Sequence, residues 1–337
     1  MYFELMEPQN YSQDQFSTPL FSSSLPPIKK KRSGFILNII LFILTFFTTT
    51  IAGVYWSNHD PYQLLNFKFG IVYSVLILSI LTAHEFGHYF AALYHKVDVT
   101  LPYYIPFPFI ELNPFGTMGA VIRMRSRASS RKALFDIGIS GPLAGWVVSV
   151  IILIIGFTTL PSIDYLYSIH PEYKTTGIPV EGFSFGYNMI FYAMEKIFAS
   201  SPKVFMPPMN EVYHYPFLCA GWFGMLITAL NMMPVGQLDG GHISYTMFGE
   251  KHKYLAYVTF SLLLIFGLGA LLEFVDPKYA FGSLNWLVWS LLILFVIKIK
   301  HPDIVTDHEE LGSTRLTLGW FSFLIFITSF CPVPFTV

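Results

Sequence analysis

Charged residues are scarce in this sequence. Asp, Glu, Lys and Arg make up 12% of the 337 residues, whereas 53% are hydrophobic and 18% are aromatic. Ordinary soluble domains carry roughly 25% charged residues, so a chain of this composition could not stay soluble in water. The scarcity of charge excludes a soluble globular protein and predicts a polytopic membrane protein that has the lipid bilayer as its partner.

Cysteine is nearly absent as well. The two cysteines, Cys219 and Cys331, both lie in apolar runs, which excludes a disulfide framework. There is no excess of charge of one sign, since the formal net charge is −1. This net charge by itself says nothing about nucleic acid, which we do not expect as a partner of a membrane protein. The positions of the charged residues along the chain are more informative than the net charge, because they indicate the membrane topology.

No secretory signal or transit peptide is visible at the start, because residues 1–24 contain acidic residues but no basic ones. Residues 1–27 are rich in Ser, Gln, Asn and Pro, a composition typical of disordered segments. The basic cluster Lys29–Arg32 directly precedes the first apolar run and is predicted to keep its side of the membrane in the cytoplasm. We expect a disordered cytoplasmic tail over residues 1–33. The lack of a leader favours a bacterial cytoplasmic (inner) membrane.

Seven apolar runs follow, and most are near the roughly 20 residues that a helix needs to cross the hydrocarbon core. They cover approximately Phe35–Trp56, Phe69–Leu93, Leu134–Leu160, Pro216–Val235, Tyr254–Val275, Leu284–Ile297 and Leu316–Phe330. The sixth and seventh are short. The sequence therefore predicts an all-α polytopic membrane protein of about 6–7 transmembrane helices, with a transmembrane domain over residues 34–335.

The basic residues are distributed unevenly between the loops. If the chain starts inside, the inner pieces are the N-terminus, Tyr94–Ala133, Gly236–Lys253 and Lys298–Arg315, which together hold 15 of the 20 Lys and Arg residues. The outer pieces hold the other 5. Because Lys and Arg are enriched in cytoplasmic loops, this distribution supports the proposed spans and a cytoplasmic N-terminus.

The second apolar run ends in an H-E-x-x-H sequence, His84-Glu85-Phe86-Gly87-His88. On a helix, residues four apart lie on one face about one turn from each other, so the two histidines can hold one Zn²⁺. Glu85 then lies close enough to activate a water at the metal. Such a short pattern also arises by chance, but two histidines and a carboxylate are costly at membrane depth and indicate a functional site.

The loop after the second run is too apolar to be solvated, and the prolines of Leu101–Ile110 exclude a continuous helix. Gly116–Met124 shows strand-like alternation with turn glycines. We predict a re-entrant β-element with an exposed strand edge near the metal. Irregular backbone is tolerated at membrane depth only where protein or a water-filled cavity satisfies it. The alternative is a packed surface loop without a catalytic part.

The fourth run leads into a carboxylate, Asp239, which two glycines follow. The second and fourth runs both cross from outside to inside, so Asp239 falls toward the same membrane face as His84 and His88. Asp239 is therefore the predicted third metal ligand, with His242 as the alternative. Asn231, about two turns earlier, is expected either to donate hydrogen bonds to a substrate backbone or to bind neighbouring helices.

Other polar or small residues receive structural interpretations. The small residues of Gly138–Gly145, in the third run, are expected chiefly to let helices approach closely in lipid. Asp136 is expected to be an ordinary helix-start carboxylate. Four further histidines are expected to be surface, interface or solvated loop residues: His170, His214, His252 and His301.

Taken together, His84–His88, Gly141–Gly145 and Asn231–Gly240 resemble the site-2 protease family of intramembrane zinc metalloproteases, in the family's order. The sequence is most similar to the branch that lacks a PDZ domain. The resemblance is good over roughly Leu81–Gly249 and looser beyond it. It implies a catalytic core at about residues 69–249.

The resemblance implies one Zn²⁺ per chain, held by His84, His88 and Asp239, with Glu85 as the catalytic carboxylate. It also implies a transmembrane protein substrate that is held by strand addition to the re-entrant element. The expected substrate-binding residues are Gly116, Thr117, Met118, Gly119, Ala120 and Asn231. The activity expected is hydrolysis of peptide bonds in or near transmembrane segments, as in regulated intramembrane proteolysis. The oligomeric state is not indicated.

Two alternative functions stay open. A di-iron membrane oxidase or desaturase also uses H-x-x-x-H boxes, but it needs more clustered histidines than this sequence offers. His95 lies one stretch beyond His88 and has no evident partners. A transporter or another non-catalytic membrane protein could bind a metal for structure, with all coordination positions closed.

Overall fold

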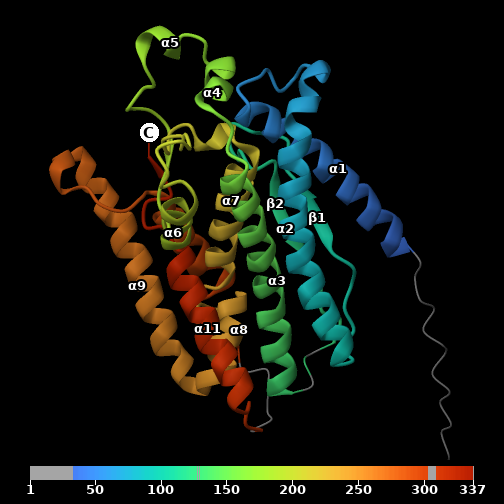
Figure 1. The fold of residues 1–337 in the computed structure, drawn as a ribbon. Helices are drawn as coiled ribbons and strands as arrows, with labels where there is room; N and C mark the ends of the chain where they lie inside the picture. Colours follow the sequence, from blue (N-terminus) through green and yellow to red (C-terminus); the bar gives the residue numbers. More distant parts are fainter. Residues whose placement is uncertain (1–32, 127, 129, 303–308, 337) are drawn as a thin grey trace, which may run out of the picture. The chain divides into compact units, whose positions relative to one another are not determined.

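The computed structural model of the protein describes residues 33–126, 128, 130–302 and 309–336, which form a bundle of helices (Figure 1). The predicted tail over residues 1–33 lies, apart from Ser33, outside these described residues. Strands are few and short among them. The predicted class, an all-α polytopic membrane protein with a re-entrant β-element, is confirmed.

Each of the seven predicted apolar runs forms a helix. These helices are α1 (Ser33–Trp56), α2 (Phe67–Tyr94), α3 (Arg131–Thr158), α7 (Pro216–Asn231), α9 (His252–Ala270), α10 (Asn285–Leu292, continued by a π-helical turn at Ile293–Ile297) and α11 (Ser313–Ser329). Within the part of the chain that the structure describes, four stretches can cross a membrane by length and composition: Phe35–Trp56, Leu64–Tyr94, Arg131–Thr158 and Asp239–Phe274. In the last of these, α8 (Asp239–Phe248) precedes α9. Asp239 therefore begins a helix, instead of ending the fourth run as expected.

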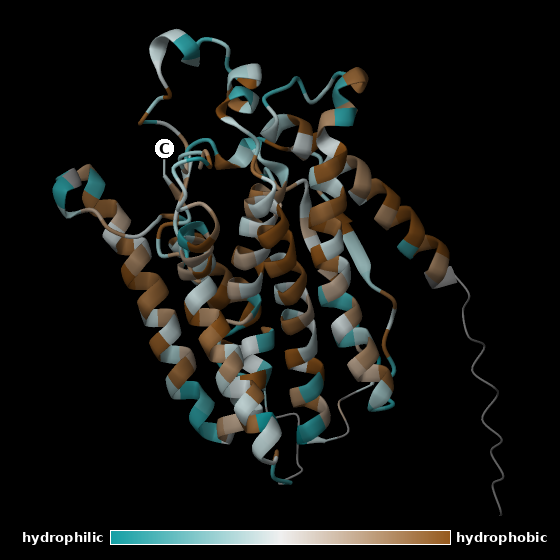
Figure 2. Cartoon of the chain, viewed as in Figure 1, coloured by the Kyte–Doolittle hydropathy of each residue, from teal (hydrophilic) through white to brown (hydrophobic). Residues whose placement is uncertain are grey.

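The outward faces of the long helices are apolar. Phe35 and Ile36 of α1 are 60% and 64% exposed, and Figure 2 shows the long helices hydrophobic over most of their length, with hydrophilic residues at the lower ends of α3 and α9. Exposed apolar surface of this extent would be unfavourable in water, whereas lipid accepts it. These helices belong to an integral membrane protein.

Helix α7 forms the centre of the bundle, which explains its shortness. Most residues from Leu218 to Ala229 are buried, and Trp222 and Phe223 are among the largest side chains with no exposure. Because protein surrounds α7, its 16 residues do not need to match the thickness of the hydrocarbon. The helix packs against both α2 and α3.

The loop between α2 and α3 runs along the bundle and returns. Near its start, the Asn38 amide of α1 donates to the carbonyls of Leu101 (3.1 Å) and Pro102 (2.6 Å). At its far end, the Trp56 indole donates to the carbonyl of Pro114 (2.9 Å). Asn38 and Trp56 are 18 residues apart on one helix, a span of about 27 Å. The loop is therefore re-entrant over most of the depth of the bundle.

Two strands shape this loop. β1 (Tyr103–Pro106) pairs antiparallel with β2 (Thr117–Val121), with an irregularity between Tyr104 and Pro106, and β2 packs against α2 (Figure 1). Within the described residues this sheet has two strands. One edge of β2 is thus free of a strand partner there.

Residues 159–215 do not form a separate module. They contain α4 (Ile163–Ile169), α5 (Tyr173–Thr176), β3 (Ser184–Phe185) and α6 (Met189–Phe198), and β3 pairs antiparallel with β4 (Phe335–Thr336) near the C-terminus. The buried Phe191 of α6 packs edge-on against Phe157 of α3.

Asp136 is more than an ordinary helix-start carboxylate. It accepts two hydrogen bonds of 2.8 Å from the Arg315 guanidinium of α11 and lies 2.8 Å from His95 Nε2 of the α2 terminus. His95 thus pairs with a carboxylate of α3, and it belongs to neither group of potential metal ligands among the described residues. These contacts bring together three helix ends that are distant in sequence, which sequence reasoning alone could not reveal.

We predict that Asp136→Asn destabilises the protein by about 2 kcal/mol, because it removes a charge-assisted pair of hydrogen bonds and leaves Arg315 without its anion. The midpoint of thermal unfolding in detergent should fall. The control is Lys132→Gln, which breaks the ion pair between Lys132 and the 61% exposed Glu309. That change should cost less than about 0.5 kcal/mol. Equal effects of both substitutions would contradict the assignment.

Candidate metal centre

The two histidines of the H-E-x-x-H sequence lie on one face of α2, as the helical repeat predicts. His84 Nε2 and His88 Nε2 are 3.1 Å apart, and both rings are buried. Asp239, at the first position of α8, places its Oδ2 atom 3.4 Å from each of these nitrogens. The structure therefore brings together the three residues that the sequence singled out as ligands.

A glycine-containing turn delivers Asp239 to this position. α7 ends at Asn231, the chain turns, and α8 starts at Asp239. A Cβ on Gly240 would overlap the carbonyl of Met232, and one on Gly241 would overlap the carbonyl of Gly236. Only glycine lets the first turn of α8 pack so closely against the preceding turn. A carboxylate in the first turn is also favoured by the helix dipole.

The spacing of the three donor atoms fits one tetrahedral ion. Zn–N distances of about 2.0–2.1 Å place neighbouring ligand atoms about 3.3 Å apart in a tetrahedron. The observed distances between the donors are 3.1 Å and, twice, 3.4 Å. Two imidazoles and one carboxylate are also a donor set that zinc uses in catalytic sites.

The orientation of His88 supports the same conclusion. Its Nδ1–H donates to the carbonyl of Ile137 in α3 (2.6 Å), so the lone pair of the neutral ring is on Nε2. That lone pair faces His84 Nε2 and Asp239 Oδ2. Electron pairs turned toward one point in a buried site repel one another unless a cation or a proton lies between them. A bond from the second nitrogen to a carbonyl is also how metal-ligating histidines are held.

Small residues of α3 make room for this geometry. A Cβ on Gly141 would overlap the His88 ring, and one on Gly145 would lie 3.2 Å from His84 Cβ. A Cβ on Gly87 of α2 would lie 2.5 Å from the carbonyl oxygen of Ser140. The stretch predicted to serve helix packing thus also shapes the site. α3 continues through Pro142 as one helix.

A cavity of about 290 Å³ opens beside the three donors. Glu85 lines it and is 6% exposed. The backbone of Ile122, directly after β2, interacts with the Glu85 carboxylate. The cavity therefore brings the candidate base, the donors and a strand edge into one space.

The structure places the expected substrate-binding residues unevenly. Ala120 and Asn231 line the cavity, whereas Gly116, Thr117, Met118 and Gly119 do not. Gly116 instead packs against the backbone of Thr48 and Thr49 in α1. The part of the β-element that lines the cavity is Ala120, Val121, Ile122 and Met124. All four residues fall within the predicted strand edge, and Ala120 is the one of them that was expected to bind substrate.

Gln237, Leu238 and His242 also line the cavity. Sequence reasoning missed the first two, although they lie in the run that contains Asp239. His242, the alternative third ligand, directs its Nδ1 toward His301 Nε2 at 2.7 Å. It does not belong to the group of three donors.

The expectation that His252 and His301 are solvated is wrong. Each is 4% exposed, and the His301 backbone N–H donates to His252 Nε2 (3.1 Å). Burial, and then the neighbouring His242, lower the pKa of His301 to about 4. His301 is therefore neutral, and it packs its ring on Tyr245 of α8 with centroids 4.3 Å apart. The chain folds these loop histidines back onto the turn that holds Asp239.

Comparisons with known proteins agree with this geometry. The model of peptidase family M50 matches residues 72–266. The probable chloroplastic zinc metalloprotease EGY1 of Oryza sativa subsp. japonica is 26% identical over 93% of this chain and 54% of its own length. The protein of the same name from Arabidopsis thaliana is 26% identical over 89% and 53%, and Arabidopsis EGY2 is 24% identical over 83% and 44%.

The chain spans about half the length of the curated relatives it matches. No solved structure matches it significantly. The names of these relatives say that they are chloroplastic, so they give no support to the expected bacterial inner membrane.

We predict that Gly141→Ala lowers the affinity of the centre for Zn²⁺ by at least about tenfold, because the added methyl group displaces the His88 ring. Zinc content after purification, measured by mass spectrometry, tests this. Ser140→Ala is the comparison, since it removes a hydroxyl that shares the Ile137 carbonyl with His88 Nδ1 but adds no methyl group against the His88 ring. Full zinc occupancy in Gly141→Ala would contradict the prediction.

Proposed function

The chain belongs to peptidase family M50, the site-2 protease family, and we propose that it is an intramembrane zinc metalloprotease. Its substrates would be membrane proteins, cleaved in or near their transmembrane segments. The observation that carries the proposal is that the ligand atoms of His84, His88 and Asp239 lie only 3.1–3.4 Å from one another. They do so inside a bundle with apolar outer faces.

In this proposal His84, His88 and Asp239 hold one Zn²⁺ per chain. The ion, when bound, supplies a Lewis acid that polarises the scissile carbonyl and acidifies water. Holding the ion requires neutral imidazoles and an ionised carboxylate. The bond from His88 Nδ1 to the Ile137 carbonyl keeps the proton of that ring away from the ion-binding nitrogen.

Glu85 acts as the general base and then as the general acid. Its carboxylate takes a proton from the attacking water and later gives that proton to the nitrogen of the leaving amine. Glu85 follows His84 directly in α2 and lines the same cavity, so its carboxylate faces the reaction space without being one of the three donors. Its near-complete burial limits competition from bulk solvent.

The substrate would be held as an added strand along Ala120–Ile122. A transmembrane helix hides its carbonyl groups in hydrogen bonds, so the segment to be cleaved must unwind first. Unpaired backbone groups are costly at membrane depth, and pairing with the free edge of β2 replaces the lost bonds. Asn231, across the cavity, can donate to the substrate backbone.

The proposed orientation of the protein in the membrane depends on the distribution of basic residues. Of the 20 Lys and Arg residues, 15 lie on the side of the N-terminus in the predicted topology. That side would be the one from which the protein inserts. The metal centre lies toward it, since α2 runs from Phe67 to Tyr94 and His84 and His88 fall in its second half.

We predict that Glu85→Gln keeps one Zn²⁺ at the centre but lowers peptide cleavage by at least about 10²-fold, because the amide cannot accept the proton. The assay is hydrolysis of a panel of transmembrane peptides by purified protein in detergent. His84→Ala is the comparison, and it should lose both the metal of this centre and the activity. Cleavage by Glu85→Gln at the rate of the unchanged protein would refute the role of this base.

A second prediction concerns the strand edge. Ile122→Pro removes the backbone N–H beside Glu85 and should lower kcat/KM for transmembrane peptides by about 5- to 100-fold, with zinc retained. Ile122→Ala keeps the N–H and should retain most activity. If both variants cleave equally well, strand addition at this edge is wrong.

A further inference from the structure

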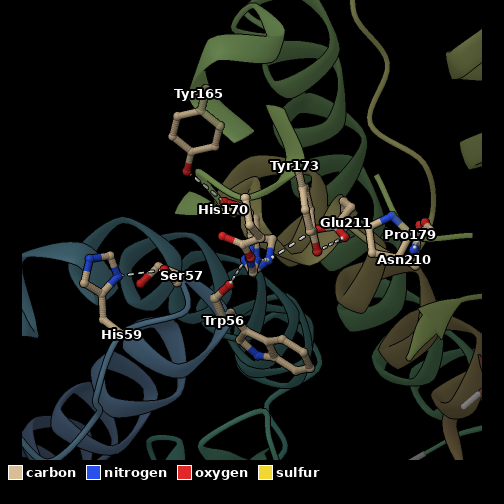
Figure 3. Close-up of polar contacts among 11 residues, drawn as sticks. Trp56, Ser57, His59, Tyr165, His170, Tyr173, Pro179, Asn210 and Glu211 are labelled. Carbon is tan, nitrogen blue, oxygen red and sulfur yellow. Dashed lines mark hydrogen bonds and ion pairs between the residues drawn. The ribbon is translucent and has the colours of Figure 1, made fainter. Parts of the chain in front are cut away.

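A second group of metal-ligating side chains lies at the opposite end of the bundle. It consists of His170, in the loop after α4, of Glu211, which precedes a 3₁₀ turn just before α7, and of His214, which ends that turn; Figure 3 labels His170 and Glu211. Glu211 is 2% exposed and His214 3%. The expectation that both histidines are ordinary surface or interface residues therefore fails for His214.

This group is remote from the candidate metal centre. His214 Nδ1–H donates to the carbonyl of Trp56, at the end of α1. α2 begins near that end, with Gly70 packed against Gly53, and reaches His84 14 residues later. At 1.5 Å per helical residue, this places the two groups about 20 Å apart. They cannot share an ion.

The donor atoms of the second group converge. His170 Nε2 lies 3.0 Å from His214 Nε2, and His214 Nε2 lies 3.4 Å from Glu211 Oε2. All three residues offer ligand atoms within 4.8 Å of one another.

Both histidines are oriented by bonds on their other nitrogen. His214 donates from Nδ1 to the Trp56 carbonyl (2.7 Å), and His170 has its Nδ1 3.0 Å from the Glu172 carboxylate. Carbonyl and carboxylate oxygens only accept, so each neutral ring carries its lone pair on Nε2. The two Nε2 lone pairs then face each other. Metal-binding histidines are held by outer partners in this way.

Glu211 supplies an independent sign of a missing ligand. Its Oε1 accepts a hydrogen bond from Tyr173 (3.0 Å), whereas its Oε2 is buried without a hydrogen-bond partner among the described residues. Burial, and then the bond to Glu211, raise the pKa of the Tyr173 phenol, so that phenol remains a donor. A buried carboxylate oxygen without a donor is costly, and a cation at the two Nε2 atoms would remove that cost.

We propose that His170, Glu211 and His214 bind a second Zn²⁺ ion, or a similar divalent transition-metal ion, at the membrane face opposite the proteolytic centre. Two imidazoles and one carboxylate suit such an ion. The site is reachable, because His214 also lines a cavity of about 320 Å³ together with His59 and Tyr165.

The bound ion would fasten the segment between α3 and α7 to the end of α1. It would close the loop from His170 to Glu211 and fix His214, which holds the Trp56 carbonyl. Closing a loop of this length removes conformational entropy from the unlinked chain. The ion therefore has a structural role, and the proposal does not depend on proteolytic activity.

Metal counting tests the proposal on the full-length protein in detergent. After equilibration with Zn²⁺ and removal of excess, the protein should hold two zinc ions per chain. His84→Ala should hold one, and His84→Ala combined with His170→Ala should hold none. His170 is chosen because it is the most exposed of the three, with a side-chain exposure of 16%.

His59→Ala is the matched control. His59 lines the same cavity as His214, but its Nδ1 donates to the Ser57 carbonyl and it is outside the group of three (Figure 3). Combined with His84→Ala, it should leave one zinc ion bound. The proposal would be overturned if the double variant His84→Ala, His170→Ala still bound a zinc ion, or if His84→Ala alone bound none. Either result would instead favour a proton shared by the two rings.

A spectroscopic readout covers the case in which a variant folds poorly. In the His84→Ala background, addition of Co²⁺ should give d–d absorption bands of one bound ion per chain. His170→Cys in the same background should add a thiolate-to-cobalt charge-transfer band, because the substituted side chain ligates the ion directly. Absence of the d–d bands from the His84→Ala protein would refute the second site.

Discussion

Three electron-pair donors that face one point in a buried site impose the main constraint on this fold. Their mutual repulsion is unfavourable unless a cation lies among them, and lipid around the bundle supplies no water to screen it. His84 and His88 come from α2 and Asp239 from the start of α8, so an ion at the centre links two parts of the chain that share no continuous element. Metal binding and the packing of the bundle are therefore one equilibrium.

The surrounding packing can be understood from this requirement. α3 must approach α2 closely enough for the Ile137 carbonyl to reach His88, and side chains larger than glycine at positions 87 and 141 would prevent that approach. The short α7 lies at the centre, where its C-terminal end leads into the turn that carries Asp239. The re-entrant strands complete the cavity on the remaining side. Close helix contacts in lipid depend on small residues in the same way.

The positions of the three donors could be predicted from the sequence, because they follow from local helical spacing or from depth in the membrane. Helical spacing predicts that His84 and His88 pair, and the topology predicts that Asp239 lies at their level. The cavity-lining part of the β-element could not be predicted, because it depends on how the two strands pair and on how β2 packs against α2. The burial of loop histidines such as His214 was missed for a similar reason. It depends on contacts with α1, which is more than 150 positions away.

The order of the donors along the chain has a consequence for biosynthesis. A ribosome-bound chain that has inserted α1, α2 and α3 carries both histidines and Glu85, but it lacks the third donor. Asp239 follows only after α7, and it reaches the centre only once the turn at Gly240 and Gly241 has folded. The nascent chain is thus incomplete while it shares the translocation machinery with other unfolded membrane proteins. In the proposed function, hydrolysis requires all three donors, so it becomes possible only after α8 docks.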